Sequence, residues 1–70
     1  MGKYHIWSDS ESKVRVSDEL YDKVFDNSED AYNAAVDFTH KFDGEPYRVI
    51  TYVEDLEIEE TIDVVENIRN

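Results

Sequence analysis

Seven carboxylates lie close together in residues 53–67 of this 70-residue chain, in the stretch VEDLEIEETIDVVEN. No lysine or arginine interrupts the stretch. A carboxylate set of this density can bind divalent cations, serve in acid–base catalysis or attract a positively charged partner. The candidate partner-binding residues are Glu54, Asp55, Glu57, Glu59, Glu60, Asp63 and Glu66.

The side chains that usually perform catalysis or bind metals form no motif in this sequence. His5 and His40 are the only histidines, and neither has a zinc-type spacing such as H-E-x-x-H. There is no cysteine, and no serine lies in a G-x-S-x-G context. The stretch DSESK, residues 9–13, alternates oxygen ligands but lacks the glycine and the terminal glutamate of an EF-hand loop. We therefore expect no enzymatic activity and no catalytic, cofactor-binding or metal-binding residues.

The charge of the chain limits the partners that it can bind. Eighteen acidic and seven basic residues give a net charge of −11, beyond the magnitude of about 2–8 recommended for a small soluble domain. Such an excess repels DNA, RNA and anionic lipid, and no apolar run is long enough to span a membrane. The absence of cysteine fits a reducing compartment. We therefore expect a cytoplasmic protein that binds neither nucleic acid nor membrane directly.

The elements that must position the carboxylates belong to one small domain, residues 1–70, because so short a chain has room for one core. Alternating apolar side chains predict strands over residues 3–7, 13–17 and 46–54. A polar turn is expected at residues 8–12. Residues 18–27 fit a helix or a strand, and we favour a strand at residues 23–25.

The clearest predicted element is a helix over residues 28–43. Asn27 or Ser28 supplies an N-cap, and Gly44 followed by Pro46 ends the helix. Apolar residues recur at helical spacing along one face, which predicts the side that packs on the sheet. The face consists of Ala31, Ala35, Phe38 and Phe42.

Residues 56–68 form an acidic amphipathic element that fits two structures. As a helix, it places Glu59, Asp63 and Glu66 at i, i+4 and i+7 on one outer face. As a strand, it agrees with the β-branched residues and sets Glu57 and Glu59 about 7 Å apart, close to a phosphate spacing. We favour the helix because of the glutamates and the length. The predicted fold is α+β: a β-β-α-β core with an antiparallel sheet packed by one main helix, plus this C-terminal element.

The short length, the lack of cysteine, the expected β-β-α-β core and the run EDLEIEETIDVVE give the chain a resemblance to a class of phage proteins. It resembles the small acidic inhibitors that phages encode against host enzymes, including nucleic-acid mimics that block restriction, CRISPR or transcription machinery. The resemblance implies a basic protein partner, namely a nucleic-acid-binding host enzyme or complex, and a location in the host cytoplasm. It also implies that the seven carboxylates act by charge and position.

A different class of function fits the same sequence. In this alternative the chain is a small structural or assembly domain that forms a homodimer through a sheet edge or through Trp7. The acidic face would then serve only as a solvated surface that prevents aggregation.

Self-repulsion among the acidic side chains predicts that salt stabilises the fold. Adding sodium chloride should raise the melting temperature in a thermal melt followed by circular dichroism, because counter-ions screen the charge of −11. A melting temperature that does not respond to salt would mean that the acids are well spread or locally paired.

Overall fold

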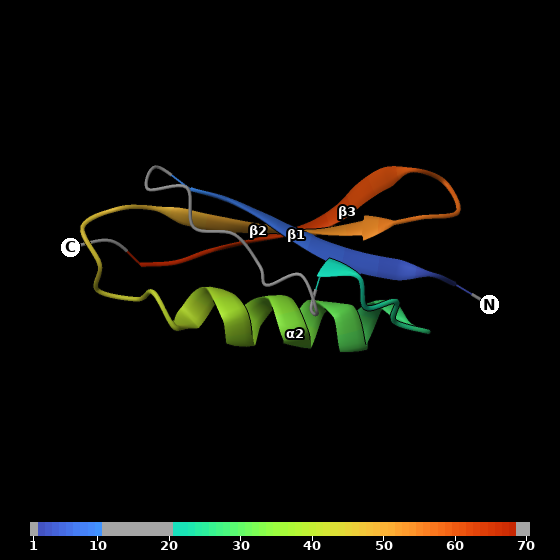
Figure 1. Cartoon of the computed structure of the whole chain (residues 1–70), viewed down its shortest axis with the longest axis horizontal. Coiled ribbons are helices and arrows are strands. Elements are labelled where there is room, and N and C mark those ends of the chain that lie inside the picture. Colours follow the sequence, from blue (N-terminus) through green and yellow to red (C-terminus); the bar gives the residue numbers. More distant parts are fainter. Residues whose placement is uncertain (1, 11–20, 69–70) are drawn as a thin grey trace.

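A sheet and a helix form two layers in the part of the chain that the structure describes (Figure 1). The computed structural model describes residues 2–10 and 21–68. Its elements are the strands β1 (Tyr4–Ser10), β2 (Val49–Asp55) and β3 (Glu60–Glu66) and the helix α2 (Ser28–His40). The strands pair antiparallel in the order β1-β2-β3, and α2 lies across one face of the sheet. The α+β class and the antiparallel sheet packed by one main helix are thereby confirmed.

The ends of α2 follow from the residues that cap it. Asn27 has an extended backbone, and its side chain accepts a hydrogen bond of 2.8 Å from the backbone N–H of Asp30. The helix ends at His40, three residues before the predicted end at residue 43. Gly44 closes the turn that follows with a φ of 86°, a conformation that glycine adopts without steric cost.

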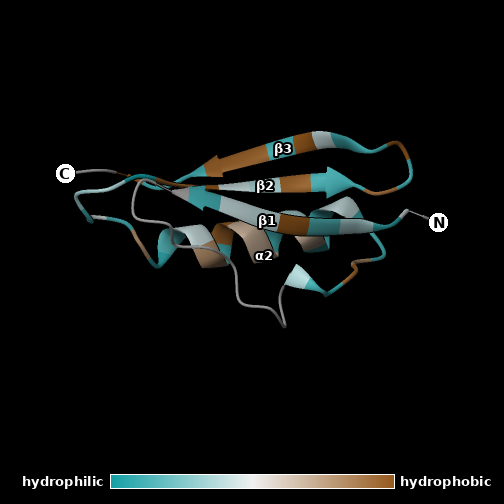
Figure 2. Cartoon of the chain, turned by 45° about the horizontal axis from the view of Figure 1, so that its top comes forward, coloured by the Kyte–Doolittle hydropathy of each residue, from teal (hydrophilic) through white to brown (hydrophobic). Residues whose placement is uncertain are grey.

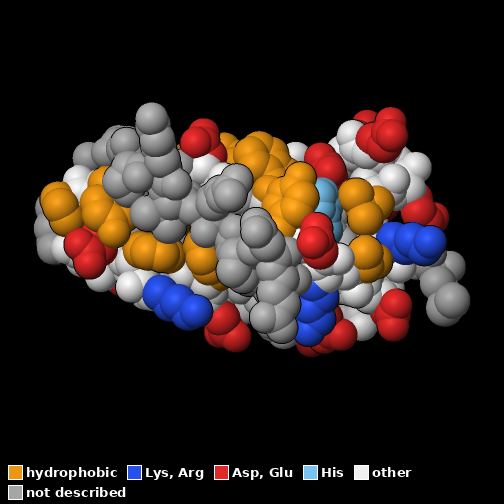
Figure 3. All heavy atoms as spheres, in the orientation of Figure 1, with side chains coloured by type: hydrophobic (Ala, Val, Ile, Leu, Met, Phe, Trp, Pro, Cys, Tyr) orange, Lys and Arg blue, Asp and Glu red, His pale blue; other side chains and the backbone are white. Residues whose placement is uncertain are grey.

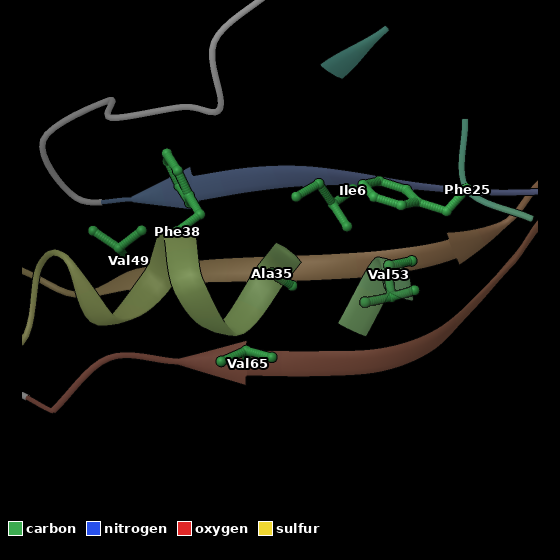
Figure 4. Close-up of a cluster of buried hydrophobic side chains, with 8 residues drawn as sticks. Ile6, Phe25, Ala35, Phe38, Val49, Val53 and Val65 are labelled. Carbon is green, nitrogen blue, oxygen red and sulfur yellow. The ribbon is translucent and has the colours of Figure 1, made fainter. Parts of the chain in front are cut away.

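The hydrophobic core lies between α2 and the sheet (Figure 4). Alternation along β2 turns Val49, Thr51 and Val53 toward α2, and Ile50 and Tyr52 toward the opposite face of the sheet. All three strands contribute side chains to the core. The core is small because few side chains of so short a chain become fully buried. The buried apolar residues are Ile6, Phe25, Ala31, Ala35, Phe38, Val49, Val53 and Val65.

The predicted C-terminal helix over residues 56–68 is wrong. Residues 56–59 form a turn, and β3 pairs with β2 so that Val65 lies opposite Thr51 and Val64 opposite Tyr52. A helix would have set like charges at i and i+4, whereas the strand suits the β-branched residues and forms a ladder with β2. The register skips Ile62, which leaves a β-bulge in β3.

The beginning of the chain also differs from the prediction. β1 extends to Ser10, so the turn expected at residues 8–12 is wrong over residues 8–10, because these residues pair along β2. The predicted strand over residues 13–17 lies outside the described residues, as do residues 18–20 of the ambiguous segment. At residues 23–25, the expected strand is reduced to one bridge, in which Phe25 and Tyr4 exchange backbone hydrogen bonds of 3.0 and 2.8 Å.

Asn67 is a buried polar residue that joins three segments of the chain. Its side-chain Oδ1 accepts a hydrogen bond from the backbone N–H of Val49. Its Nδ2 donates to the carbonyl oxygens of Phe42, at 2.7 Å, and of Tyr47, at 3.4 Å. Its exposed fraction is 3%, so these hydrogen bonds form away from bulk water.

Removal of this side chain should destabilise the fold strongly. Asn67→Ala leaves the Val49 N–H and two carbonyl oxygens without their protein partner, so we expect a loss of about 2–3 kcal/mol in the free energy of unfolding, measured by urea denaturation. Asn33, which is exposed on α2, supplies the matched control, because Asn33→Ala should be neutral or slightly stabilising. Equal stability of the two variants would contradict the structural role of Asn67.

Candidate functional site

The hairpin formed by β2 and β3 holds all seven predicted binding residues. Its turn, residues 56–59, lies at the same end of the molecule as the N-terminus and extends past the end of α2 (Figure 1). The backbone N–H of Leu56 donates a 2.8 Å hydrogen bond to the carbonyl of Lys3, which ties the turn to the beginning of β1. The tip of the hairpin is therefore anchored to the sheet although its side chains lie in solvent.

Two local features shape the turn. The side chain of Asp55 accepts a 2.9 Å hydrogen bond from the backbone N–H of Glu57, as in an Asx-turn. Glu59 has a φ of 56°, in the left-handed region that disfavours residues with a Cβ. Glycine or asparagine is the usual residue in this conformation, so a glutamate here is a strained choice.

Three of the predicted carboxylates form the exposed tip of the hairpin. Glu57, Glu59 and Glu60 are all exposed, and none of them has an ion pair within residues 2–10 and 21–68. Figure 3 shows acidic side chains in red at the end of the molecule where Figure 1 places this hairpin. Three unpaired charges in four residues give the tip a negative field that a basic partner would neutralise.

Two other predicted carboxylates lie on the sheet face opposite α2, and both have partners. Glu54 accepts a 2.8 Å hydrogen bond from Nε2 of His5 across the β1–β2 pair. Arg48 donates to Glu66 at 3.3 Å. These side chains are partly committed to neighbours within the sheet, so they contribute less free charge than the tip.

The last two predicted carboxylates lie on the helix-facing side of the sheet, as the register requires. Asp63 lies opposite the buried Val53, yet its own side chain is exposed. Asp55 lies opposite Glu60, a like-charged cross-strand pair that destabilises a hairpin. The seven residues therefore occupy both faces and one tip. The helical row of Glu59, Asp63 and Glu66 does not exist.

The carboxylate spacing predicted for a strand, which would resemble that of phosphates, is also absent. Glu57 and Glu59 were expected at i and i+2 of one strand, about 7 Å apart, but both lie in the turn. Mimicry at this site would therefore depend on the cluster at the tip.

The sheet face opposite α2 carries an aromatic pair that the pattern of charges did not indicate. Trp7 stacks on Tyr52 with ring centroids 4.1 Å apart and an interplanar angle of 17°. Val64 continues this row on β3, because Tyr52 pairs with Trp7 on one side and with Val64 on the other. The alternation in the sequence places Trp7 and Tyr52 in strands, but no signal in the sequence sets the register that brings them together.

The described residues show neither a metal centre nor a membrane helix. No group of three or more His, Asp or Glu side chains within residues 2–10 and 21–68 is arranged to hold a metal ion. The one helix labelled in the described ranges is too short and too polar to cross a bilayer.

Comparison with known proteins returns no relative of this chain. No protein-family model, curated protein or solved structure matches it. The function is consequently inferred from the charge and geometry of the chain itself.

The strain at Glu59 predicts different stabilities for two substitutions that remove the same charge. Asn tolerates the left-handed conformation better than Gln does, so Glu59→Asn should be more stable than Glu59→Gln by about 0.5–1 kcal/mol in urea denaturation. A Gln variant as stable as the Asn variant would show that the backbone at this position is not strained.

Proposed function

We propose that the chain is a non-enzymatic, acidic protein-binding module that occupies the basic nucleic-acid-binding surface of a partner protein. The observation that supports this function is the unpaired carboxylate tip formed by Glu57, Glu59 and Glu60. The remaining predicted residues, Glu54, Asp55, Asp63 and Glu66, extend the negative surface along the hairpin.

Long-range attraction would bring such a partner to the hairpin. Residues 51–70 contain seven acids and one base, so this end of the chain has a net charge of −6. A cleft lined with lysine and arginine concentrates negatively charged ligands and accelerates their association, and the attraction weakens as salt increases. The same cleft binds phosphate groups, so the acidic module and the nucleic acid would compete for it.

The chain retains unfavourable charge where a neutral sequence would be more stable. Asp55 opposes Glu60 across the strands, and Glu59 occupies a conformation that favours glycine or asparagine. Strained or destabilising choices of this kind concentrate at functional sites. They support a role for the hairpin beyond solubility. A host enzyme or complex of the restriction, CRISPR or transcription machinery is the class of partner that we propose.

Charge reversal at the tip tests this function. The triple variant Glu57→Lys, Glu59→Lys, Glu60→Lys should lose its partner, because three reversals raise the net charge from −11 to −5 and place positive charge against a basic cleft. The assay is affinity capture from cell lysate at low salt, followed by elution with rising salt and, separately, with duplex DNA. Wild-type protein should release the partner in both elutions.

The control reverses three exposed acids away from the hairpin. The substitutions Asp22→Lys, Asp37→Lys and Glu45→Lys produce the same net charge, and circular dichroism would verify that both variants fold. The control variant should retain the partner. Capture by the tip variant equal to that by the control, or a complex that DNA does not disrupt, would refute the proposal.

A further inference from the structure

The outer edge of β3 is open in the described part of the chain. β3 is the last strand in the sheet order, and Figure 2 shows it with β2 along one side only. No backbone hydrogen bond from residues 2–10 or 21–68 reaches its other side. The opposite edge of the sheet differs, because Phe25 bonds to β1 at Tyr4. An open edge strand is a template for pairing with another chain.

The register shows which backbone groups of β3 face outward. Asn67 donates a backbone hydrogen bond of 3.1 Å to Val49, which sets the phase of the antiparallel ladder. Every second residue of β3 before Asn67 therefore bonds to β2, namely Val65 and Asp63. The N–H and C=O groups of Val64 and Glu66 point away from the sheet and are available to an added strand.

The side chains of this edge favour a basic occupant. β3 contains Glu60, Asp63 and Glu66 and no basic residue. Glu66 forms an ion pair with Arg48, whereas Glu60 and Asp63 have no ion pair in the described ranges. Lysine or arginine on a strand added beside β3 would form opposite-charge cross-strand pairs with these acids.

The same charges oppose pairing with a second copy of the chain. An antiparallel self-pairing centred on Asp63 would set Asp63 against its own copy and Glu60 against Glu66. A basic strand would remove this repulsion and cover two exposed apolar side chains, Ile62 at 38% and Val64 at 55% exposure.

We infer that β3 binds an extended, basic segment of the protein partner as an added strand, hydrogen-bonded to the outward groups of Val64 and Glu66. The inference rests on the proposed function and specifies how the acidic module holds its partner. The segment would alternate lysine or arginine with β-branched residues, because successive side chains of a strand point to opposite faces.

The first test removes one outward N–H from the full chain. Val64→Pro deletes a donor that β2 does not use, at an edge position where proline is tolerated. The probe is a fluorescein-labelled nine-residue peptide that alternates lysine with threonine, and its affinity is measured by fluorescence anisotropy. Val64→Pro should weaken binding about tenfold, as expected for one or two lost backbone hydrogen bonds. Ser28→Pro is the matched control, because Ser28 is the first residue of α2, where proline is favoured, and its affinity should equal that of wild type.

The second test changes the probe, so it does not depend on the folding of the proline variant. A peptide of the same sequence with N-methyl groups on alternate residues keeps every charge but cannot bond along one edge. Wild-type protein should bind it about tenfold more weakly than the unmodified peptide. Amide hydrogen exchange on the unmodified complex should slow at Val64 and Glu66, the two outward-facing residues.

The outcomes separate strand addition from the proposed function. Equal affinity for the two peptides, with no slowing at Val64 and Glu66, would overturn strand addition and leave the electrostatic function standing. No binding of either peptide at low salt would overturn both. Sedimentation that shows a dimer of wild-type protein and a monomer of Val64→Pro without peptide would assign the edge to a second copy and overturn the inference.

Discussion

The hydrogen bonds of Asn67 hold the acidic hairpin to the rest of the fold. β3 contributes one buried apolar side chain, Val65, to the core, so apolar packing alone attaches it weakly. Asn67 bonds to Val49 on β2 and to the segment that follows α2, and it does so where water has no access. At the other end of the hairpin, Leu56 bonds to the backbone of Lys3. The hairpin is thus fixed at both ends, and its carboxylates have defined positions.

A second buried contact joins the two layers near the C-terminal end of α2. The hydroxyl of Thr39 donates to the carbonyl of Ala35 at 2.6 Å and lies 2.7 Å from the hydroxyl of Thr51 on β2. Both threonines are fully buried, so their bonds fix how α2 lies along the sheet. With the core so small, these polar contacts set the orientation of the layers while the acids remain outside. The excess charge therefore lies outside the core.

Local signals predicted much of the fold. Caps at Asn27 and Gly44 and the spacing of Ala31, Ala35 and Phe38 gave the helix, and alternation gave β2. β3 was missed because its amphipathic pattern fits either period, and pairing with β2 decided the outcome. The aromatic stack of Trp7 on Tyr52 depends on strand register, which no local pattern encodes. The bonds of Asn67 connect residues 18 to 25 positions apart, so they too have no local signal.

We propose that the carboxylates of the β2–β3 hairpin meet a basic surface of a protein partner. Chemical-shift mapping of the 15N-labelled chain with the captured partner tests it most directly. We expect the largest shifts to occur within residues 54–66, to shrink as salt increases and to be reversed by duplex DNA. Shifts concentrated on α2, or shifts at the hairpin that persist in high salt and in the presence of DNA, would contradict it.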